Sequence, residues 1–572
     1  MSGSAHMPRP GTDPTASPAD ARADDSAVVV IGGGISGLAT AALLAHDGWS
    51  VDLVEARDEL GGRAGSWEQD GFRFDTGPSW YLMPEVFDHF FRLLGTSSAE
   101  QLDLRLLDPG YRVLYDGYEE PLDVHASAAR NADAFERIEA GAGHRLVEYL
   151  DSAATTYDLA LAHFLYTSFS ALRGSLDPAV IARAPRLLTL LLQPLETFVA
   201  RRFQDPRLRQ VLGYPAVFLG SSPDRTPSMY HLMSALDLTG GVQYPQGGFA
   251  RLIDAIVALA EREGVRLHTG TRATEILTTQ RDTAGHRRRR SGPGALRGTD
   301  LPARDAEVQG VEVRTADGGH RTLRADVVVA TADLHHVETT LLPRTLQTYP
   351  ESWWRRRTSG PGAVLVMLGV RGPLPQLEHH TLFFTEDWRE NFGAIRAGRV
   401  PSPASTYVCR PSATDPSVAP AGHENLFVLV PVPSDPSLGH GGVDGAGTPA
   451  IERIADEAIA RIAEQAGIPD LDERVVVRRT VGPAEFSEDL GAWQGSMLGP
   501  AHTLRQSAFF RAGNASRRVR GLLYAGSSTL PGIGLPMCLI SAELVAKRLR
   551  GDRSSAPLPE PAARTAGVGD ET

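Results

Sequence analysis

The sequence has few of the features that mark secreted, metal-clustered or membrane-spanning proteins. Cysteine occurs only twice in 572 residues, at Cys409 and Cys538. Two cysteines provide neither a disulfide framework nor a cysteine-based metal cluster, and they fit a reducing cytosol. Residues 1–25 have no apolar core of the kind a signal peptide needs, and we expect a disordered leader there. No run approaches the roughly 20 apolar residues of a spanning helix.

Positive charge is also scarce. The chain carries 57 Lys and Arg against 69 Asp and Glu, a formal net charge of −12. This balance argues against a nucleic acid as the main partner. It does not exclude a membrane surface, because a local patch can differ from the whole. Apolar residues at 42% and charged residues at 22% are ordinary for a globular protein, and the length allows two or three structural units.

What the sequence does contain is a glycine-rich loop between a strand and a helix, in "VVVIGGGISGLATAALLAHDG". The β-branched start predicts a buried parallel strand. Gly32, Gly34 and Gly37 then match G-x-G-x-x-G. Gly32 permits a tight turn, Gly34 lets a pyrophosphate approach the backbone, and Gly37 lets the helix pack closely. Glu55 ends a second strand 18 residues after Gly37, where a carboxylate can bind ribose hydroxyls. The pattern predicts a dinucleotide-binding βαβ unit rather than an ordinary turn.

Two further glycine motifs point to the same kind of site. "ARDELGGRAGS" follows Glu55 directly and contains Gly62 and Arg63. Near the C-terminus, the predicted strand "GLLYAG" leads through "SSTLPGIG" into a predicted helix with Pro536 in its first turn. Ligands of doubly wound sheets bind beyond the carboxyl ends of the strands, so this element can bring a second helix N-terminus to the ligand. Taken singly, each motif is also compatible with a structural turn.

Several dispersed stretches carry a resemblance to a known family. They include "VIGGGISGL", "LVEARDELGGRAGSWEQDGFRFDTGPS", "GGVQYPQGG", "ADVVVATADL" and "QGSMLGPAHTLRQSAFFRAGNASRRVRGLLYAGSSTLPGIGLPMCLISAELVA". They occur in family order over residues 28–548. On these residues the chain resembles the bacterial-type phytoene desaturases, of the carotenoid desaturase family of FAD-dependent oxidoreductases.

The resemblance implies a set of FAD-binding residues. It assigns the pyrophosphate to Gly32, Gly34, Ser36 and Gly37, the adenosine ribose to Glu55, the pyrophosphate and flavin to Gly62, Arg63, Gly77, Pro78 and Ser79, adenine to the backbone of Ala273, and the ribityl chain and flavin ring to Gly526, Gly532, Gly534, Pro536 and Met537. The chain departs from the wider flavin group at one position. Many relatives carry an acid just after the last strand glycine, and here Ser527 stands there, which implies a weaker or water-mediated ribityl contact.

The implied fold is α/β: a Rossmann-type FAD-binding domain of the amine-oxidase-like kind, with an inserted α+β substrate domain and a helical, membrane-contacting region. Strands are expected at "AVLVMLGV", "HHTLFFT", "STYVCR" and "NLFVLVPV". The expected division is a leader at 1–25, FAD-binding parts at 26–110, 241–345 and 491–551, the helical region at 111–240, the substrate sheet at 346–490, and a disordered tail at 552–572. Residues 278–307 form a flexible insertion between the strands "RATEIL" and "VQGVEVRT". Its arginine run at 287–290 suggests a solvated hairpin in preference to an anion-binding patch.

The resemblance implies that FAD accepts hydride from an allylic carbon and that a proton leaves the neighbouring carbon. Repetition converts phytoene to lycopene, and oxygen or a quinone reoxidises the flavin. The residues identify no catalytic group: Asp75, His231, Asp237 and Glu338 are open as proton acceptors, and none is assigned. His335 and His336 are adjacent and diverge on a helix, so no metal is predicted.

Other functions are compatible with parts of this pattern. One is a related carotenoid enzyme: a diapophytoene or hydroxycarotenoid desaturase, a ketolase or an isomerase-like member. Another is an amine oxidase, which needs an aromatic cage that "GSSTLPGIGLPM" does not supply. A third is a flavin-free lipid carrier, and the intact phosphate loop argues against it.

Residues 157–203 combine long apolar runs with Arg173, Arg186, Arg201 and Arg202. A helix lying in a membrane interface has this mixture, and so does an ordinary core helix. The implied substrate, a hydrophobic polyene, resides in bilayers and favours the first alternative. We therefore expect a cytoplasmic protein associated peripherally with the inner face of the cell membrane.

Overall fold

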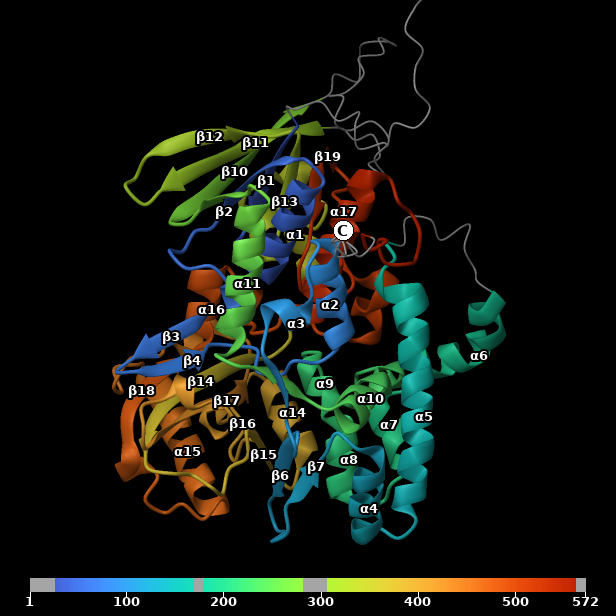
Figure 1. Ribbon diagram of the computed structural model, residues 1–572, viewed down its shortest axis with the longest axis vertical. Helices are drawn as coiled ribbons and strands as arrows, with labels where there is room; N and C mark the ends of the chain where they lie inside the picture. The colour runs from blue at the N-terminus through green and yellow to red at the C-terminus, as the bar shows by residue number, and fades with distance from the viewer. Residues whose placement is uncertain (1–25, 169–177, 281–305, 562–572) are drawn as a thin grey trace, which may run out of the picture.

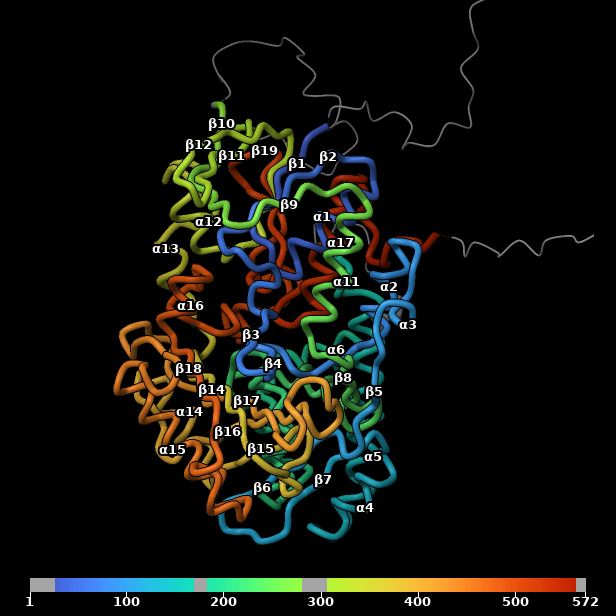
Figure 2. Tube along the Cα trace, turned by 60° about the vertical axis from the view of Figure 1, so that its left-hand side comes forward, coloured from blue at the N-terminus to red at the C-terminus, as the bar shows by residue number. Residues whose placement is uncertain are grey.

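The computed structural model describes residues 26–168, 178–280 and 306–561. The expected leader and the arginine run at 287–290 lie outside the described residues. Figures 1 and 2 show two lobes, with strands β1, β2 and β13 in one and strands β14 to β17 in the other. Strands β3 (Ser66–Gln69) and β4 (Phe72–Asp75) form a small antiparallel ladder between them.

A five-stranded parallel sheet forms the centre of the first lobe, in the order β20-β13-β1-β2-β9. Its strands are β1 (Ala27–Ile31), β2 (Ser50–Val54), β9 (Arg266–His268), β13 (Val327–Ala330) and β20 (Leu522–Tyr524). They come from three separate stretches of the chain, so other segments interrupt this lobe twice. Both faces are covered, which explains why "VVV" in β1 is fully buried and β-branched throughout.

Each face of the parallel sheet has its own cover. Helices α1 (Ile35–His46), α11 (Phe249–Arg262) and α17 (Leu535–Arg550) share one hydrophobic cluster with it. The other face packs on a second sheet made of β10 (Thr271–Gln280), β11 (Ala306–Thr315), β12 (His320–Arg324) and β19 (Val519–Arg520). Strands β10 and β11 pair antiparallel from one end to the other. The two strands expected to flank the insertion therefore exist, and residues 281–305 lie outside the described residues.

The second lobe contains a seven-stranded mixed sheet in the order β18-β14-β17-β16-β15-β6-β7. Its strands are β6 (Tyr111–Tyr115), β7 (Leu122–Val124), β14 (Gly362–Arg371), β15 (His380–Phe384), β16 (Thr406–Cys409), β17 (His423–Val432) and β18 (Val475–Val481). The four strands predicted between residues 361 and 432 are all present. Helix α15 (Pro449–Gln465) covers one face, and the other face looks toward the first lobe.

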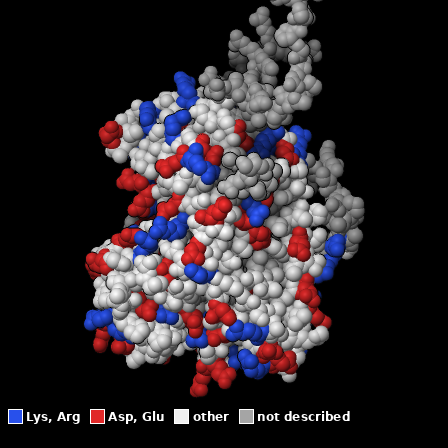
Figure 3. All heavy atoms as spheres, in the orientation of Figure 1, with Lys and Arg blue, Asp and Glu red and all other residues white. Residues whose placement is uncertain are grey.

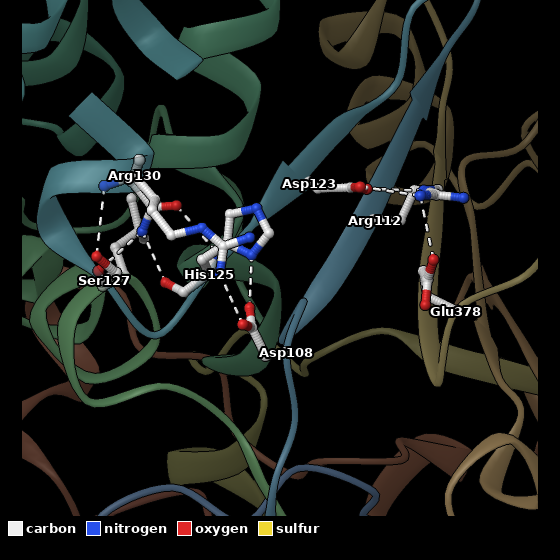
Figure 4. A network of polar contacts seen from close by, with 9 residues as sticks. Asp108, Arg112, Asp123, His125, Ser127, Arg130 and Glu378 are labelled. Atoms are coloured by element: carbon white, nitrogen blue, oxygen red, sulfur yellow. Dashed lines mark hydrogen bonds and ion pairs between the residues drawn. The ribbon is translucent and has the colours of Figure 1, made fainter. Parts of the chain in front are cut away.

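A network of charged side chains attaches the β6–β7 hairpin to this sheet (Figure 4). Arg112 on β6 bonds Asp123 on β7 at 2.7 Å and reaches Glu378, just before β15, at 3.1 Å. At the other side of the hairpin, Asp108 accepts hydrogen bonds from His125 and Arg130, both at 2.6 Å. The hairpin is thus held on the parallel edge of β15, some 270 residues away in sequence.

Helices form the side of the second lobe. The principal ones are α4 (Ala128–Ile138), α5 (Ala142–Ala160), α6 (Pro178–Leu192), α7 (Leu195–Ala200) and α8 (Pro206–Gly213). The remaining elements are α2 (Pro84–Leu93), α3 (Ser98–Gln101), β5 (Leu104–Leu106), α9 (Pro215–Phe218), α10 (Met233–Ala235), β8 (Gln243–Pro245), α12 (Leu334–Thr340), α13 (Glu351–Trp354), α14 (Trp388–Arg396), α16 (Pro483–Leu490) and short 3-10 and π turns. None of the helices in the described residues is long and apolar enough to cross a bilayer.

The expectation of a disordered tail from residue 552 is wrong for residues 552–561. Leu558 is buried, and its backbone N–H donates to Glu543 on α17. The Lys547 ammonium, also on α17, donates to the carbonyl of Ser554 at 2.9 Å. The polar, proline-rich composition concealed one apolar anchor and the buried charges that it covers. Residues 562–572 lie outside the described residues.

Gly37 tests how tightly α1 is packed on β1. A Cβ at Gly37 would lie 1.9 Å from the carbonyl oxygen of Gly32, a backbone atom that cannot move aside. We expect Gly37→Ala to lower the free energy of unfolding by about 1–3 kcal/mol or more, as overpacking does. The matched control is Gly393→Ala in α14, where a Cβ meets nothing within 4 Å. Chemical denaturation of both variants checks this, and equal stabilities would contradict it.

Candidate functional site

A cavity of about 680 Å³ begins at the carboxyl ends of the parallel strands and extends between the lobes. This is the position in which doubly wound folds bind their ligands, and the volume is typical of ligand pockets. The residues assigned to FAD come together here from widely separated stretches. The lining includes Gly32, Gly34, Ser36, Glu55, Gly62, Arg63, Gly77, Pro78, Ser79, Ala273, Gly526, Gly534, Pro536 and Met537. Gly37 and Gly532 are not part of the lining.

The first glycine loop divides its roles as the motif predicts. Gly32 adopts a φ of +108°, and a Cβ there would lie 2.9 Å from the Ala332 backbone nitrogen. At Gly34, the N-cap of α1, a Cβ would meet nothing closer than 3.8 Å, so the space beside it is open. Gly37 lies behind the loop as a packing residue. The Ser36 hydroxyl oxygen is buried and has no hydrogen-bond partner among the described residues.

Backbone contacts bring the second glycine motif against the first. Gly34 and Gly61 form an isolated parallel bridge, and a Cβ on Gly62 would lie 3.2 Å from the Gly34 Cα. A Cβ on Gly77 would lie 2.0 Å from the carbonyl oxygen of Arg63. These close approaches explain why "GGR" and "DTGPS" need glycine, and they place Arg63 at the cavity.

Two charged side chains at this end are arranged for a polar ligand. Glu55 accepts hydrogen bonds from the backbone N–H groups of Gly33 at 2.6 Å and Arg57 at 2.9 Å, which fix its carboxylate at the cavity wall. The Arg63 guanidinium is 3.8 Å from Asp333. Its Nε and Nη2 are buried and, among the described residues, make no hydrogen bond. A buried donor without a partner is costly, so these nitrogens suit an anionic ligand.

The C-terminal element contributes a helix start and a polar pair. Gly534 is the N-cap of α17, and Pro536 stands in its first turn. Gly532 packs on a side chain: a Cβ there would lie 2.4 Å from the His502 ring, so its assignment as a flavin contact is corrected to a packing role. His502 faces the Tyr230 hydroxyl at 2.7 Å, and burial holds its pKa well below the usual range. Both side chains line the cavity, and the sequence gave no local signal for either.

Away from the glycine loops the cavity is apolar and aromatic. Its wall includes Trp80, Tyr214, Phe218, Leu382, Phe384 and Trp388. Phe218 lies 5.2 Å from the Trp80 ring centroid and 4.8 Å from that of Tyr214. These rings come from the loop after β4, helices α8 to α9 and strand β15, so no local pattern could predict the wall. The missing aromatic residue in "GSSTLPGIGLPM" is therefore no argument about the cavity as a whole.

None of the four residues considered as proton acceptors lines the cavity, within the residues that the structure describes. Asp75 accepts from the backbone of Phe249 at the start of α11, and burial raises its pKa to about 6. Asp237 accepts from the Tyr111 hydroxyl, and burial raises its pKa to about 7. His231 and Glu338 are likewise buried and hydrogen-bonded elsewhere. All four hold the fold together around the cavity.

The histidine pairs behave differently from each other. His335 contacts Glu351 at 2.6 Å while His336 lines the cavity, so the two diverge as expected. His379 and His380, in contrast, meet Cys409, with one donor atom from each within 4.8 Å of the others. The expectation that the cysteines join no such cluster is corrected here, because β15 and β16 pair His380 opposite Cys409. Burial lowers the pKa of both imidazoles and raises that of the thiol, which leaves all three groups uncharged at neutral pH.

Comparisons with known proteins agree with this site. A family model for flavin-containing amine oxidoreductases matches residues 35–550. A carotenoid 3,4-desaturase of Haloarcula japonica is 40% identical over 92% of this chain and 98% of its own. A ζ-carotene-forming phytoene desaturase of Myxococcus xanthus is 34% identical over 91% of this chain and 93% of its own. Among solved structures, an oxidoreductase from Methanosarcina mazei superposes with a TM-score of 0.56 at 15% identity, covering 91% of this chain and all of that one. Putrescine oxidase gives 0.55 at 15% identity, over 91% and 98%.

The chain belongs to the flavin-containing amine oxidoreductase family, and its fold is the one that family shares. Within it, the chain is a member of the carotenoid desaturase group of FAD-dependent oxidoreductases, which act on CH–CH groups. The site fits FAD on its own evidence. The unpartnered Ser36 hydroxyl and Arg63 nitrogens, the open space at Gly34 and the fixed Glu55 carboxylate match a dinucleotide with a pyrophosphate and a ribose.

Gly34 offers a direct test of the cofactor site. Valine at Gly34 meets no protein atom closely, because the φ of −72° is ordinary and the space beside it is open. We therefore expect Gly34→Val to fold normally and to lose flavin, since the side chain fills the space of the pyrophosphate. Flavin absorbance and circular dichroism of the purified variant check this. Full flavin occupancy would remove Gly34 from the site.

Proposed function

We propose that the protein desaturates a carotenoid precursor, with phytoene as substrate and lycopene as the product of repeated steps. One observation carries the proposal: the FAD site opens directly into a long cavity whose far wall is apolar and aromatic. Phytoene is a hydrocarbon without charge or carbonyl, so a cavity for it needs shape and apolar surface rather than hydrogen bonds. The relatives named above, with their printed activities on carotenoids, support the same substrate class.

The chain's own residues bind, orient and enclose. FAD, when bound, supplies a hydride acceptor, which acid–base chemistry alone does not provide. Trp80, Tyr214 and Phe218 offer flat apolar faces to a polyene and exclude water. His502 remains a neutral imidazole in the cavity, because burial holds its pKa low. We further propose that oxygen or a quinone accepts the electrons, which fits a site reached from a lipid phase.

Phe218 separates substrate binding from cofactor binding. We expect Phe218→Ala to raise KM for phytoene by about tenfold or more, because burying an aromatic side chain contributes about 1.5–3 kcal/mol. Bound flavin should be unchanged. The control is Phe510→Ala, which truncates a ring of the same size that is 48% exposed.

The assay incubates flavin-loaded protein with phytoene in liposomes and identifies the products by chromatography. Lycopene is expected, with shorter desaturation products appearing first. A ζ-carotene end point, or reaction with lycopene at its 3,4 bond but not with phytoene, would replace the proposed substrate or end point. No product from any carotenoid by flavin-loaded protein would overturn the proposal.

We also propose that the protein docks peripherally on the cytoplasmic face of the cell membrane through α6. Leu188 and Leu192 lie one helical turn apart and are 56% and 60% exposed, whereas Leu190 turns inward and is buried. Figure 1 draws α6 at the edge of the molecule beside α5. Acidic and basic side chains are interspersed over the face in Figure 3, and the net charge is −12. Apolar insertion must therefore dominate the attachment.

Flotation with liposomes tests this placement. Leu188→Ser with Leu192→Ser should release the protein while bound flavin is retained, because the apolar contact with lipid is removed. The control pair, Val443→Ser with Val476→Ser, changes two residues that are 40% and 43% exposed in the loop before α15 and in β18. Binding of the unaltered protein should persist in 1 M salt, where the Debye length is about 3 Å. Equal recovery of all proteins with liposomes would refute the placement.

A further inference from the structure

Arg511 is a buried cation held entirely by backbone carbonyls. It follows the short helix Ala508–Phe510, and only 6% of the residue is exposed. Its Nε donates to Thr529 at 3.0 Å, and its Nη1 donates to Pro500 and Gln506, both at 3.3 Å. Its Nη2 donates to the carbonyl of Ser527. Burial lowers the pKa of Arg511 only to about 10, so the guanidinium stays charged at neutral pH.

The charge of Arg511 has no counter-charge nearby. Among the described residues no carboxylate pairs with it, and the titratable groups that interact with it are Tyr230, His502 and Cys538. All three are uncharged at neutral pH: burial raises the pKa of the phenol, raises that of the Cys538 thiol to about 11, and lowers that of the imidazole. Carbonyl dipoles offset part of the desolvation cost of a buried charge, but they do not neutralise it.

The field of this charge reaches the FAD cavity. Ser527, whose carbonyl binds Arg511, lines the cavity, as do Tyr230, His502 and Cys538. Both Arg63 and Arg511 act on the Cys538 thiol in the first turn of α17. That 16-residue helix begins at the cavity, so its N-terminal dipole adds to the two cations. Three sources of positive potential therefore converge on one end of the site.

Ser527 explains why the charge stays uncompensated. The position is the one at which the resemblance leads us to expect an acid, and an acid there would stand next to the guanidinium that its own carbonyl binds. With serine in its place, the region around Ser527, Arg511 and the start of α17 holds positive charge only. A ligand that carries or acquires negative charge at this end is the missing partner.

We propose that Arg511 supplies an uncompensated positive charge to the FAD site, which stabilises the negative charge that the flavin gains when it is reduced. Accepting a hydride transfers two electrons and one proton from the substrate, and the flavin then carries one negative charge. The effect raises the reduction potential of the bound flavin and favours hydride removal from an unactivated hydrocarbon. Arg511 acts through the field at the site and touches no reacting atom, so it is a positioning residue. The inference rests on the proposed FAD-dependent function.

Sulfite is a suitable probe, because it adds to oxidised flavin and leaves an anionic adduct. We expect Arg511→Gln to weaken sulfite binding at least tenfold and to lower the midpoint potential, measured by anaerobic dye-coupled reduction. A tenfold change corresponds to about 30 mV for a two-electron couple. Arg511→Lys keeps the charge but loses most of the carbonyl bonds, and it should stay within about threefold of the unaltered protein. If the role is structural only, both variants shift alike, which would overturn the proposal.

Ser527 gives an independent test that leaves Arg511 in place. Ser527→Asp should weaken sulfite binding by tenfold or more, and Ser527→Asn, a neutral side chain of the same size, should not. Equal effects of Asp and Asn would contradict the proposal, and so would a wild-type potential at or below that of free flavin. None of these measurements uses a carotenoid. Failure of the substrate assay with normal sulfite results would therefore count against the proposed function alone.

Discussion

Close contact between bare backbone segments at the end of β1 is the constraint on which the site depends. Gly32 turns the chain against the Ala332 backbone, Gly34 bridges to Gly61, and Gly77 lies against the Arg63 carbonyl. No side chain separates these segments, so three stretches distant in sequence form one surface of N–H groups and open space. A single Cβ at most of these points would force the loops apart. The cavity, the orientation of Arg63 and the entry to α1 follow from this contact.

Electrostatics then divide the cavity into two environments. At the glycine end, polar groups have their hydrogen bonds fixed by the backbone, as with Glu55, or lack a protein partner, as with Ser36 and Arg63. At the far end, aromatic and aliphatic side chains take over. A dinucleotide and a hydrocarbon need these opposite surroundings, and the parallel sheet and the mixed sheet supply one each. The chain as a whole is acidic, yet the charges that border the cavity are largely positive.

The sequence predicted those features that neighbours along the chain determine. The βαβ loop around Gly34, the β10–β11 hairpin, the strands from residue 361 to 432 and the helix after Gly534 all have local signatures, and the structure contains them. Features that arise from distant pairing had none. The β6 strand joins β15 in parallel across some 270 residues, and Trp80, Tyr214 and Phe384 meet at the cavity from three elements. Resemblance assigned Gly532 to the flavin, whereas its hydrogen faces the His502 ring.

Burial also explains why sequence reasoning found no proton acceptor. The acids that looked available, Asp75 and Asp237, are consumed by the fold: one receives the N–H groups at the start of α11 and the other a tyrosine hydroxyl. Placing an ionised carboxylate in the apolar half of the cavity would cost several kcal/mol without a partner. A neutral imidazole such as His502 avoids that cost. A weak base is sufficient there, because a carbon that has lost hydride makes its neighbouring C–H strongly acidic. An apolar cavity and the absence of a buried acid in its described wall are therefore consistent demands of the same chemistry.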